Sequence, residues 1–168
     1  MNYDLLASMT PTGQSNSQLL EEFRRLRNRA VRRQWWAALT GKRYDLVSLY
    51  ERQMLQETKT SRYAGLQLVS IAKIRGSASR VTDFDAGFRP LQMHNSQRWV
   101  HIAQAYHREE ALPPVELVQI GDIYFVNDGH HRISVAKLLG QQEIEAEVTV
   151  IETRTSARTG TEASTGTH

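Results

Sequence analysis

The run Asp128-Gly129-His130-His131-Arg132 is the segment best suited to chemistry, because it follows a β-rich stretch and opens a helix-forming one. Unpaired amides at a helix N-terminus, the positive end of the helix dipole and a guanidinium together form a site for phosphate. Gly129 lets the backbone approach a ligand closely, because it has no side chain. The segment predicts a phosphate site to which Gly129, His130 and His131 supply amides and imidazoles, with Arg132 as the main charge clamp.

The same residues also have structural interpretations, which the spacing leaves open. Asp128 is placed to cap the helix that follows. Arg132 can equally be an ion-pair partner within the fold, and the two histidines can be partly buried packing residues. Spacing alone does not separate these roles from phosphate binding.

A second candidate surface is strongly basic, because residues 23 to 44 contain eight Lys and Arg residues and no acidic residue. Arginines beside tryptophans can contact nucleic-acid phosphates and stack on bases. The residues concerned are Arg24, Arg25, Arg27, Arg29, Arg32, Arg33, Trp35 and Trp36. The alternatives are a protein partner, a helix on a membrane surface, or a solvated face whose arginine stems cover apolar surface and whose tryptophans pack on the main domain.

Other chemistries find less support in the residue types. The chain has no cysteine, which excludes disulfides, thiolate nucleophiles, zinc–thiolate sites and iron–sulfur clusters. Its histidines lack the spacing of ligands in a structural metal site. The metal expected instead is a Mg²⁺ ion that accompanies a nucleotide and is held by a carboxylate and phosphate oxygens. Asp83 and Asp85 could hold Mg²⁺, although such a pair more often shapes a turn or cap. No general base can be assigned, so the catalytic residues are unknown.

Two predicted helices precede the main domain. Residues 1–14 are rich in Ser, Thr, Pro and Gly and are expected to be an irregular leader. Ser15 and Gln18 have the spacing of a capping box, an apolar stripe follows at helical spacing, and Thr40-Gly41 is the expected end. A second helix, with apolar residues between Leu46 and Met54, would complete a basic helical hairpin over residues 15–58.

Residues 62–152 alternate strand and helix signals. The predicted elements are a strand from Leu66 to near Gly76, a helix from Asn95-Ser96, a hairpin over Val115 to Val126 turning at Gly121-Asp122, a helix after Gly129 that ends at Gly140, and a strand from Ile144 to Val150. Residues 153–168 contain no large apolar residue and are expected to be a disordered tail.

Charge is distributed unevenly over the 168 residues. Residues 1–60 hold ten Lys and Arg residues against six acidic ones, whereas residues 61–152 hold nine against eleven. This pattern indicates a basic arm attached to a nearly neutral domain. No apolar run approaches the ~20 residues that span a bilayer, and the first residues do not resemble a secretion signal, so no membrane span and a cytoplasmic location are expected.

The segment Asp128–Arg132 resembles the nucleotide-phosphate motif of the ParB/sulfiredoxin superfamily. ParB proteins carry G-x-x-R-x-x-A, which Gly129 and Arg132 match, with the alanine displaced by one to Ala136. Sulfiredoxins carry G-C-H-R, with His130 here in the cysteine position. The D-G-H-x-R loop of related ParB-like proteins, including free serine kinases, is matched throughout.

This resemblance covers roughly residues 66–152. It implies an α+β fold with a small mixed sheet and a prokaryotic protein. It implies that Arg80, at the end of Ile74–Arg80, approaches the same pocket. The missing cysteine excludes sulfiredoxin chemistry. The third ParB motif and a helix-turn-helix domain are not found, so a clamp that reads a centromere site is not expected.

Two functional hypotheses follow. In the first, the protein binds a nucleotide or another phosphorylated ligand at the Asp128–Arg132 loop, with Arg80 as a second cation, as a sensor or as a nucleotide hydrolase or small-molecule kinase. In the second, it is a nucleic-acid-binding accessory or regulatory protein that uses the basic helix and has a vestigial pocket. The helices also permit a protein partner or a homodimer.

Overall fold

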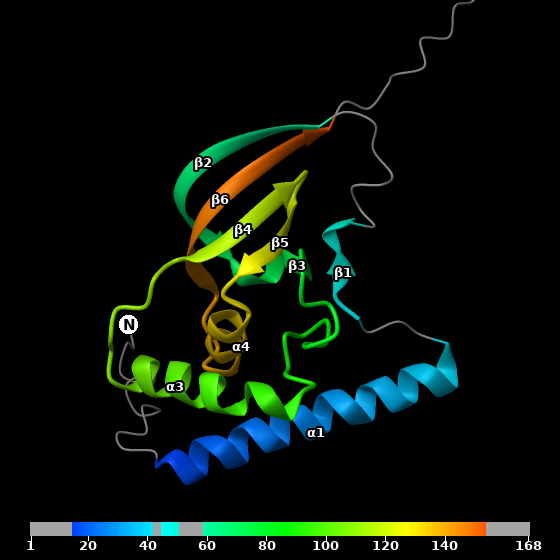
Figure 1. Ribbon diagram of the computed structural model, residues 1–168, viewed down its shortest axis with the longest axis vertical. Coiled ribbons are helices and arrows are strands. Elements are labelled where there is room, and N and C mark those ends of the chain that lie inside the picture. The colour runs from blue at the N-terminus through cyan, green and yellow to red at the C-terminus, as the bar shows by residue number, and fades with distance from the viewer. Residues whose placement is uncertain (1–14, 42–44, 51–58, 154–168) are drawn as a thin grey trace, which may run out of the picture.

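The computed structural model describes residues 15–41, 45–50 and 59–153 of the chain. It contains three α-helices and six strands in these ranges (Figure 1). The helices are α1 (Asn16–Thr40), α3 (Ser96–His107) and α4 (His130–Leu138). The strands are β1 (Val47–Ser48), β2 (Lys59–Ser70), β3 (Ile74–Ser77), β4 (Val115–Ile120), β5 (Ile123–Asp128) and β6 (Glu143–Thr153). Short 3-10 turns at Ile71–Lys73 and Met93–Asn95 lead into β3 and α3.

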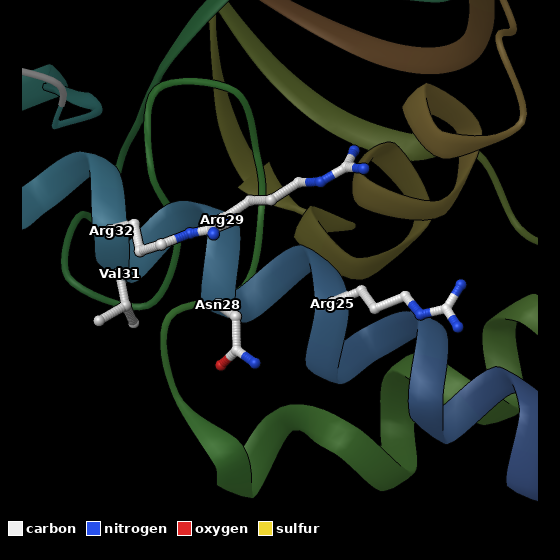
Figure 2. Close-up of a pocket in the computed structure, with 5 residues that line it drawn as sticks. All are labelled: Arg25, Asn28, Arg29, Val31 and Arg32. Carbon is white, nitrogen blue, oxygen red and sulfur yellow. The ribbon is translucent and has the colours of Figure 1, made fainter.

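Helix α1 begins and ends as the sequence predicts. The Ser15 amide donates to Gln18 Oε1 over 2.8 Å, the Gln18 amide donates to Ser15 Oγ over 3.4 Å, and Gly41 ends the helix at φ 67°. Phe23 is fully buried and packs edge-on against Trp99 of α3, with ring centroids 5.8 Å apart. Figure 2 shows the side chains of Arg25, Arg29 and Arg32 extending from α1. One stripe of α1 is therefore packed and the rest faces solvent.

The six strands form one mixed sheet in the order β1-β3-β5-β4-β6-β2. β4 and β5 form the predicted antiparallel hairpin, with Gly121 at φ 61° in its turn. β2 pairs antiparallel with β6, while β4 with β6, β3 with β5, and β1 with β3 are parallel pairs. The mixed sheet and its helices confirm the predicted α+β class.

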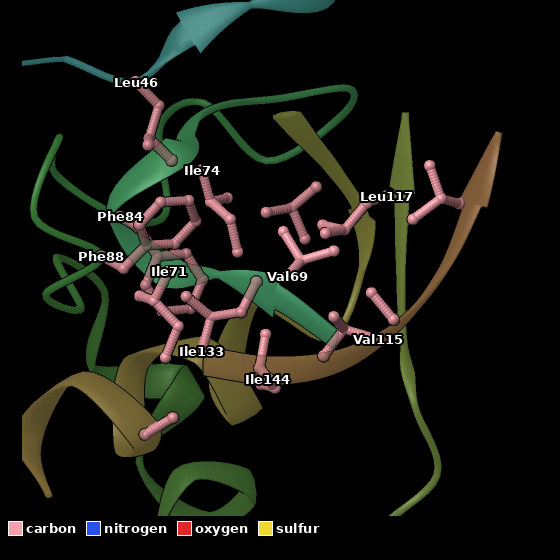
Figure 3. Packing of buried hydrophobic residues seen from close by; sticks show 14 residues of the cluster. Leu46, Val69, Ile71, Ile74, Phe84, Phe88, Val115, Leu117, Ile133 and Ile144 are labelled. Carbon is pink, nitrogen blue, oxygen red and sulfur yellow. The ribbon is translucent and has the colours of Figure 1, made fainter. Parts of the chain in front are cut away.

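The main core fills the space between the sheet and α4 (Figure 3). Alternate residues of the central strands point into it, among them Leu117 of β4 and Val148 of β6. Ile133 of α4 packs against them, and Phe84 and Phe88 close the cluster from the segment between β3 and α3. A second cluster joins α1, α3 and α4, and Trp99 Nε1 donates to Ser134 Oγ over 3.0 Å. The helices therefore stack in the order α4, α3, α1 away from the sheet (Figure 1).

Several predictions are changed or lie outside the described residues. Leu46 is buried in the main core beside β1, which joins the sheet, so the start of the predicted second helix is extended instead. Leu49 and Tyr50 are helical, as predicted. Residues 51–58, 1–14 and 154–168, which include most of that helix, the leader and the tail, lie outside the described residues. The predicted strand from Leu66 to Gly76 is divided by the 3-10 turn at Ile71–Lys73. The sheet extends past the expected start at residue 62, to Lys59.

In the part of the chain that the structure describes, none of the helices combines the length and the apolar content that a membrane-spanning segment needs.

We expect Phe23→Ala to lower the free energy of unfolding by about 3–5 kcal/mol, because it empties a fully buried aromatic site between α1 and α3. Urea denaturation followed by circular dichroism measures this change. Leu39→Ala, on the same helix but 78% exposed, is the control and should change stability by less than about 0.5 kcal/mol. Equal effects of the two substitutions would show that α1 is not docked on α3.

Candidate functional site

A sharp turn at Gly129 places the first turn of α4 against β4. Gly129 precedes α4 at φ 100°, a conformation that favours glycine, and an added Cβ would lie 2.5 Å from Val115 Cγ1. No side chain caps α4, so the predicted capping by Asp128 is wrong. The amides of the first helical turn, at the positive end of the helix dipole, therefore lack the partner that a cap would supply.

Arg132 holds this loop together from inside the protein. Its side chain is 9% exposed, and Nη1 donates to the carbonyl oxygens of Pro113 and Pro114, the latter over 2.8 Å. Nη2 pairs with the Asp128 carboxylate. Because this carboxylate is engaged by Arg132, it does not cap the N-terminus of α4. The guanidinium thus ties the β4 entry to the end of β5. Its predicted role as the main phosphate clamp stays a prediction, beside this structural role.

His130 is a buried and neutral component of the site. It is 2% exposed, stacks on Phe84 with centroids 5.6 Å apart, and its Nε2 lies 2.7 Å from Ser77 Oγ. Ser77 Oγ also accepts the amides of Ser79, over 3.2 Å, and Arg80, over 2.9 Å. Because both hydroxyl lone pairs are used, the hydroxyl hydrogen donates to His130 Nε2. Burial, and then the nearby Arg80 charge, lowers the pKa of His130 to about 4.

His131 carries a buried polar atom without a partner. The residue is 6% exposed, its ring meets Phe84 edge-on at 5.3 Å, and no described residue forms a hydrogen bond with Nε2. Burial, and then the charges of Arg98 and Arg80, lowers the pKa of His131 to about 4. Buried polar atoms in native proteins are rarely left unpaired.

These groups surround a small hollow at the start of α4, which we call the α4 hollow. It measures about 20 Å³ and is lined by Arg80, Arg98, Ile102, Asp128, Gly129, His130, His131 and Arg132. Arg80 follows β3, has a side chain 43% exposed, and lies 3.4 Å from Asp83. Arg98 comes from α3, and no ion-pair partner for it occurs among the described residues. Arg80, from the segment after β3, and Arg98, from α3, thus place two solvent-accessible cations at the N-terminus of α4.

The comparisons with known proteins bear on the whole of this domain. The sequence-family model of the ParB N-terminal domain matches residues 55–164 of the chain. The chain belongs to the ParB N-terminal domain family. Sulfiredoxin from Arabidopsis thaliana is a structural neighbour with 16% sequence identity and a TM-score of 0.38, over 49% of this chain and 82% of that one. A search of the curated proteins finds no match.

This ParB N-terminal domain brings together every residue that the sequence predicted for the phosphate site, Arg80 included. Arg98 was missed, because it stands on the polar side of an ordinary amphipathic helix with no motif around it. Arg98 lies beside the start of α4 because its neighbour Trp99 donates a hydrogen bond to Ser134 of that helix. Ser77 was also missed, since a serine at a strand end carries no sequence signal for a bond to His130. The binding roles of these residues stay predictions.

The aspartates considered for Mg²⁺ behave differently from one another in this ParB-like domain. Asp85 is 2% exposed and accepts the amides of Gly87 and Arg89, each over 2.9 Å, so it shapes a turn. Asp83 is paired with Arg80. Asp128 has a side chain 52% exposed at the rim of the α4 hollow, although Arg132 takes one oxygen. Asp83 and Asp85 are therefore engaged within the fold, and Asp128 is the carboxylate of the three that lines the α4 hollow.

We expect stability to fall between pH 6.5 and pH 4, because both buried histidines have a pKa of about 4 against 6.5 when unfolded. The unfolded chain takes up protons in this window and the folded protein does not, so lower pH favours unfolding, by on the order of 3 kcal/mol per histidine. Urea denaturation at several pH values measures the loss. His130→Gln should reduce the pH dependence, whereas His101→Gln, at an exposed position, should not. An unchanged pH dependence in His130→Gln would contradict the neutral buried state.

Proposed function

We propose that this ParB-like domain binds a phosphoryl group, of a nucleotide or of another phosphorylated ligand, in the α4 hollow. The observation that carries the proposal is the unpartnered Nε2 of His131, buried beside Arg80 and Arg98 at an uncapped helix N-terminus. Each of these features alone occurs in proteins without ligands. Together they offer one anion a set of amides, an imidazole and two guanidinium groups.

The charges of the site favour a dianion over a neutral ligand. Arg80 and Arg98 are close enough to lower the pKa of His131, so their positive charge acts on groups inside the hollow. A bound phosphate would offset that charge and accept hydrogen bonds from the amides of the first turn of α4. Because Arg132 is engaged by Pro113, Pro114 and Asp128, the proposal gives the direct charge contacts to Arg80 and Arg98.

The size of the hollow limits which part of the ligand it can hold. Its 20 Å³ is close to the space that one water molecule occupies, about 10–15 Å³ on the same measure. A phosphoryl group fits only with small movements of the exposed arginines, and the rest of a nucleotide would lie outside, toward α3. The hollow therefore recognises phosphate and not a particular base. Asp128, at the rim, can share a Mg²⁺ ion that accompanies the nucleotide.

The proposal is one of binding. Positioning and charge neutralisation supply most of the catalysis in phosphoryl transfer, and the site has the groups for both. A base that would activate water or a hydroxyl is a further requirement, to which no described residue is assigned. Product analysis of the binding mixtures therefore separates a nucleotide hydrolase or kinase from a sensor.

We expect ATP, ADP, CTP or GTP, each with Mg²⁺, to bind saturably in a calorimetric titration of the full chain. Arg98→Ala should weaken the binding roughly 10- to 100-fold, because it removes one charge-assisted contact. Arg80→Ala should act in the same direction. Arg108→Ala is the matched control, since Arg108 ends the same helix with a side chain 66% exposed and lies outside the hollow. Binding that ignores Arg98 and Arg80 would place the ligand elsewhere.

We also expect anion binding to take up protons. A bound sulfate, which stays a dianion at these pH values, should raise the pKa of His131 from about 4 toward its ordinary range. Affinity for sulfate should then increase as the pH falls from 7.5 to 5.5, by less than tenfold per pH unit. Calorimetry in two buffers of different ionisation enthalpy measures the proton uptake. His131→Gln should abolish the uptake, and uptake that persists in this variant would assign the proton to another group.

A further inference from the structure

The outer side of α1 is a basic surface with two exposed indoles. Trp35 is 71% and Trp36 67% exposed, so the expectation that they pack on the main domain is wrong. Helix α1 has no acidic residue after Glu22, while six arginines lie between residues 24 and 33. These features go beyond the phosphate binding proposed for the α4 hollow and do not depend on it.

Two adjoining hollows run along this surface and form what we call the arginine groove. One measures about 490 Å³ and is lined in part by Arg25, Arg29 and Arg32, and the other measures about 440 Å³ and shares Arg29 and Arg32. Figure 2 shows Arg25, Arg29 and Arg32 extending from successive turns of α1 in one general direction. Each hollow is more than ten times larger than the α4 hollow.

The fold adds to this groove a residue that the helix does not carry. Arg89, from the segment between β3 and α3, lines the second hollow together with Arg33 and Trp36 of α1. Its guanidinium is held 3.4 Å from Asp85, a buried carboxylate. An arginine distant in sequence thus converges with the helix arginines on one side of an exposed indole. A solvated helix face alone would not produce this convergence.

Two arginines of the groove, Arg25 and Arg89, have an acidic partner, and two others, Arg29 and Arg32, have none among the described residues. Arg25 pairs with Glu21 over 2.9 Å, in a contact exposed to solvent. For Arg29 and Arg32, no ion pair occurs within the part of the chain that the structure describes. Cations held at this density attract a polyanion and release its counterions.

We infer that the arginine groove binds single-stranded nucleic acid, with phosphates on Arg29, Arg32 and Arg89 and a base stacked on Trp36. The complementarity is twofold, because a single strand offers both a line of negative charges and unpaired aromatic faces. The stretch from Arg25 to Trp36 measures about 17 Å along α1, enough to contact a short run of nucleotides. A duplex keeps its bases stacked inside and leaves Trp36 without a partner.

Other occupants match fewer of these features. A membrane-surface helix must insert its apolar stripe, but the stripe of α1 that holds Leu19 and Phe23 is buried against α3. An acidic protein segment would pair with the arginines, yet it has no aromatic faces to offer Trp36. The test below distinguishes both from a nucleic acid.

The experiment is a titration of the full chain with a fluorescently labelled oligothymidylate of ten nucleotides, followed by anisotropy and by tryptophan fluorescence. We expect saturable binding and quenching of exposed tryptophan, since the third tryptophan, Trp99, is fully buried. With the three phosphate contacts named above, affinity should fall roughly 20-fold between 50 and 200 mM salt. Trp36→Ala should weaken binding roughly tenfold, while the matched control Trp35→Ala, outside the groove, should have little effect.

Charge reversal tests the arginines. Arg29→Glu combined with Arg32→Glu should weaken binding by about a hundredfold or more, whereas Arg62→Glu, an exposed arginine on β2, should change it only a few fold. Circular dichroism shows whether the variants keep their helix. The inference is overturned if the oligonucleotide does not bind at 50 mM salt, if the reversal has no effect, or if duplex DNA binds as tightly with no quenching. It is also overturned if polyglutamate or anionic vesicles displace the oligonucleotide at equal charge.

Discussion

The site depends on one sharp turn, at Gly129, and on the buried guanidinium that holds it. The positive φ and the close approach to Val115 admit only glycine, and they bring the first turn of α4 against β4. Arg132 then fixes both strand ends by bonding to Pro113, Pro114 and Asp128. Because α3 packs on α4 and α1 packs on α3, the positions of α3 and α1 relative to the sheet depend on this turn.

The same arrangement leaves α4 with polar groups that the protein does not satisfy. Asp128 is drawn to Arg132 and leaves the amides of the first helical turn uncapped. His131 follows the turn into a buried position where Nε2 has no described partner. Burial of two neutral histidines and an unpaired nitrogen opposes stability, since each is better solvated in the unfolded chain. A ligand that completes these bonds would stabilise the fold as well as bind to it.

Local chemistry made part of this structure predictable from sequence. The capping box at Ser15, the Gly121-Asp122 turn and the D-G-H-H-R motif act within a few residues, and the ParB-like family followed from the last of them. Arg98, Arg89 and Ser77 could not be found in this way, because each enters its site through tertiary packing. The alternative in which the tryptophans pack on the main domain fails for a related reason. An indole in a sequence favours burial, and only the docked position of α1 shows that Trp35 and Trp36 face solvent.

The two candidate anion sites rest on different physics. In the α4 hollow, fixed amides and a desolvated imidazole act in a small buried space, where salt screens weakly and protonation matters. In the arginine groove, exposed guanidinium groups act through water, so salt screens strongly. Trp99 lies between them, since it contacts Phe23 of α1 and bonds to Ser134 of α4. A change at Trp99 would therefore disturb both sites, whereas a change at Arg98 would leave the groove intact.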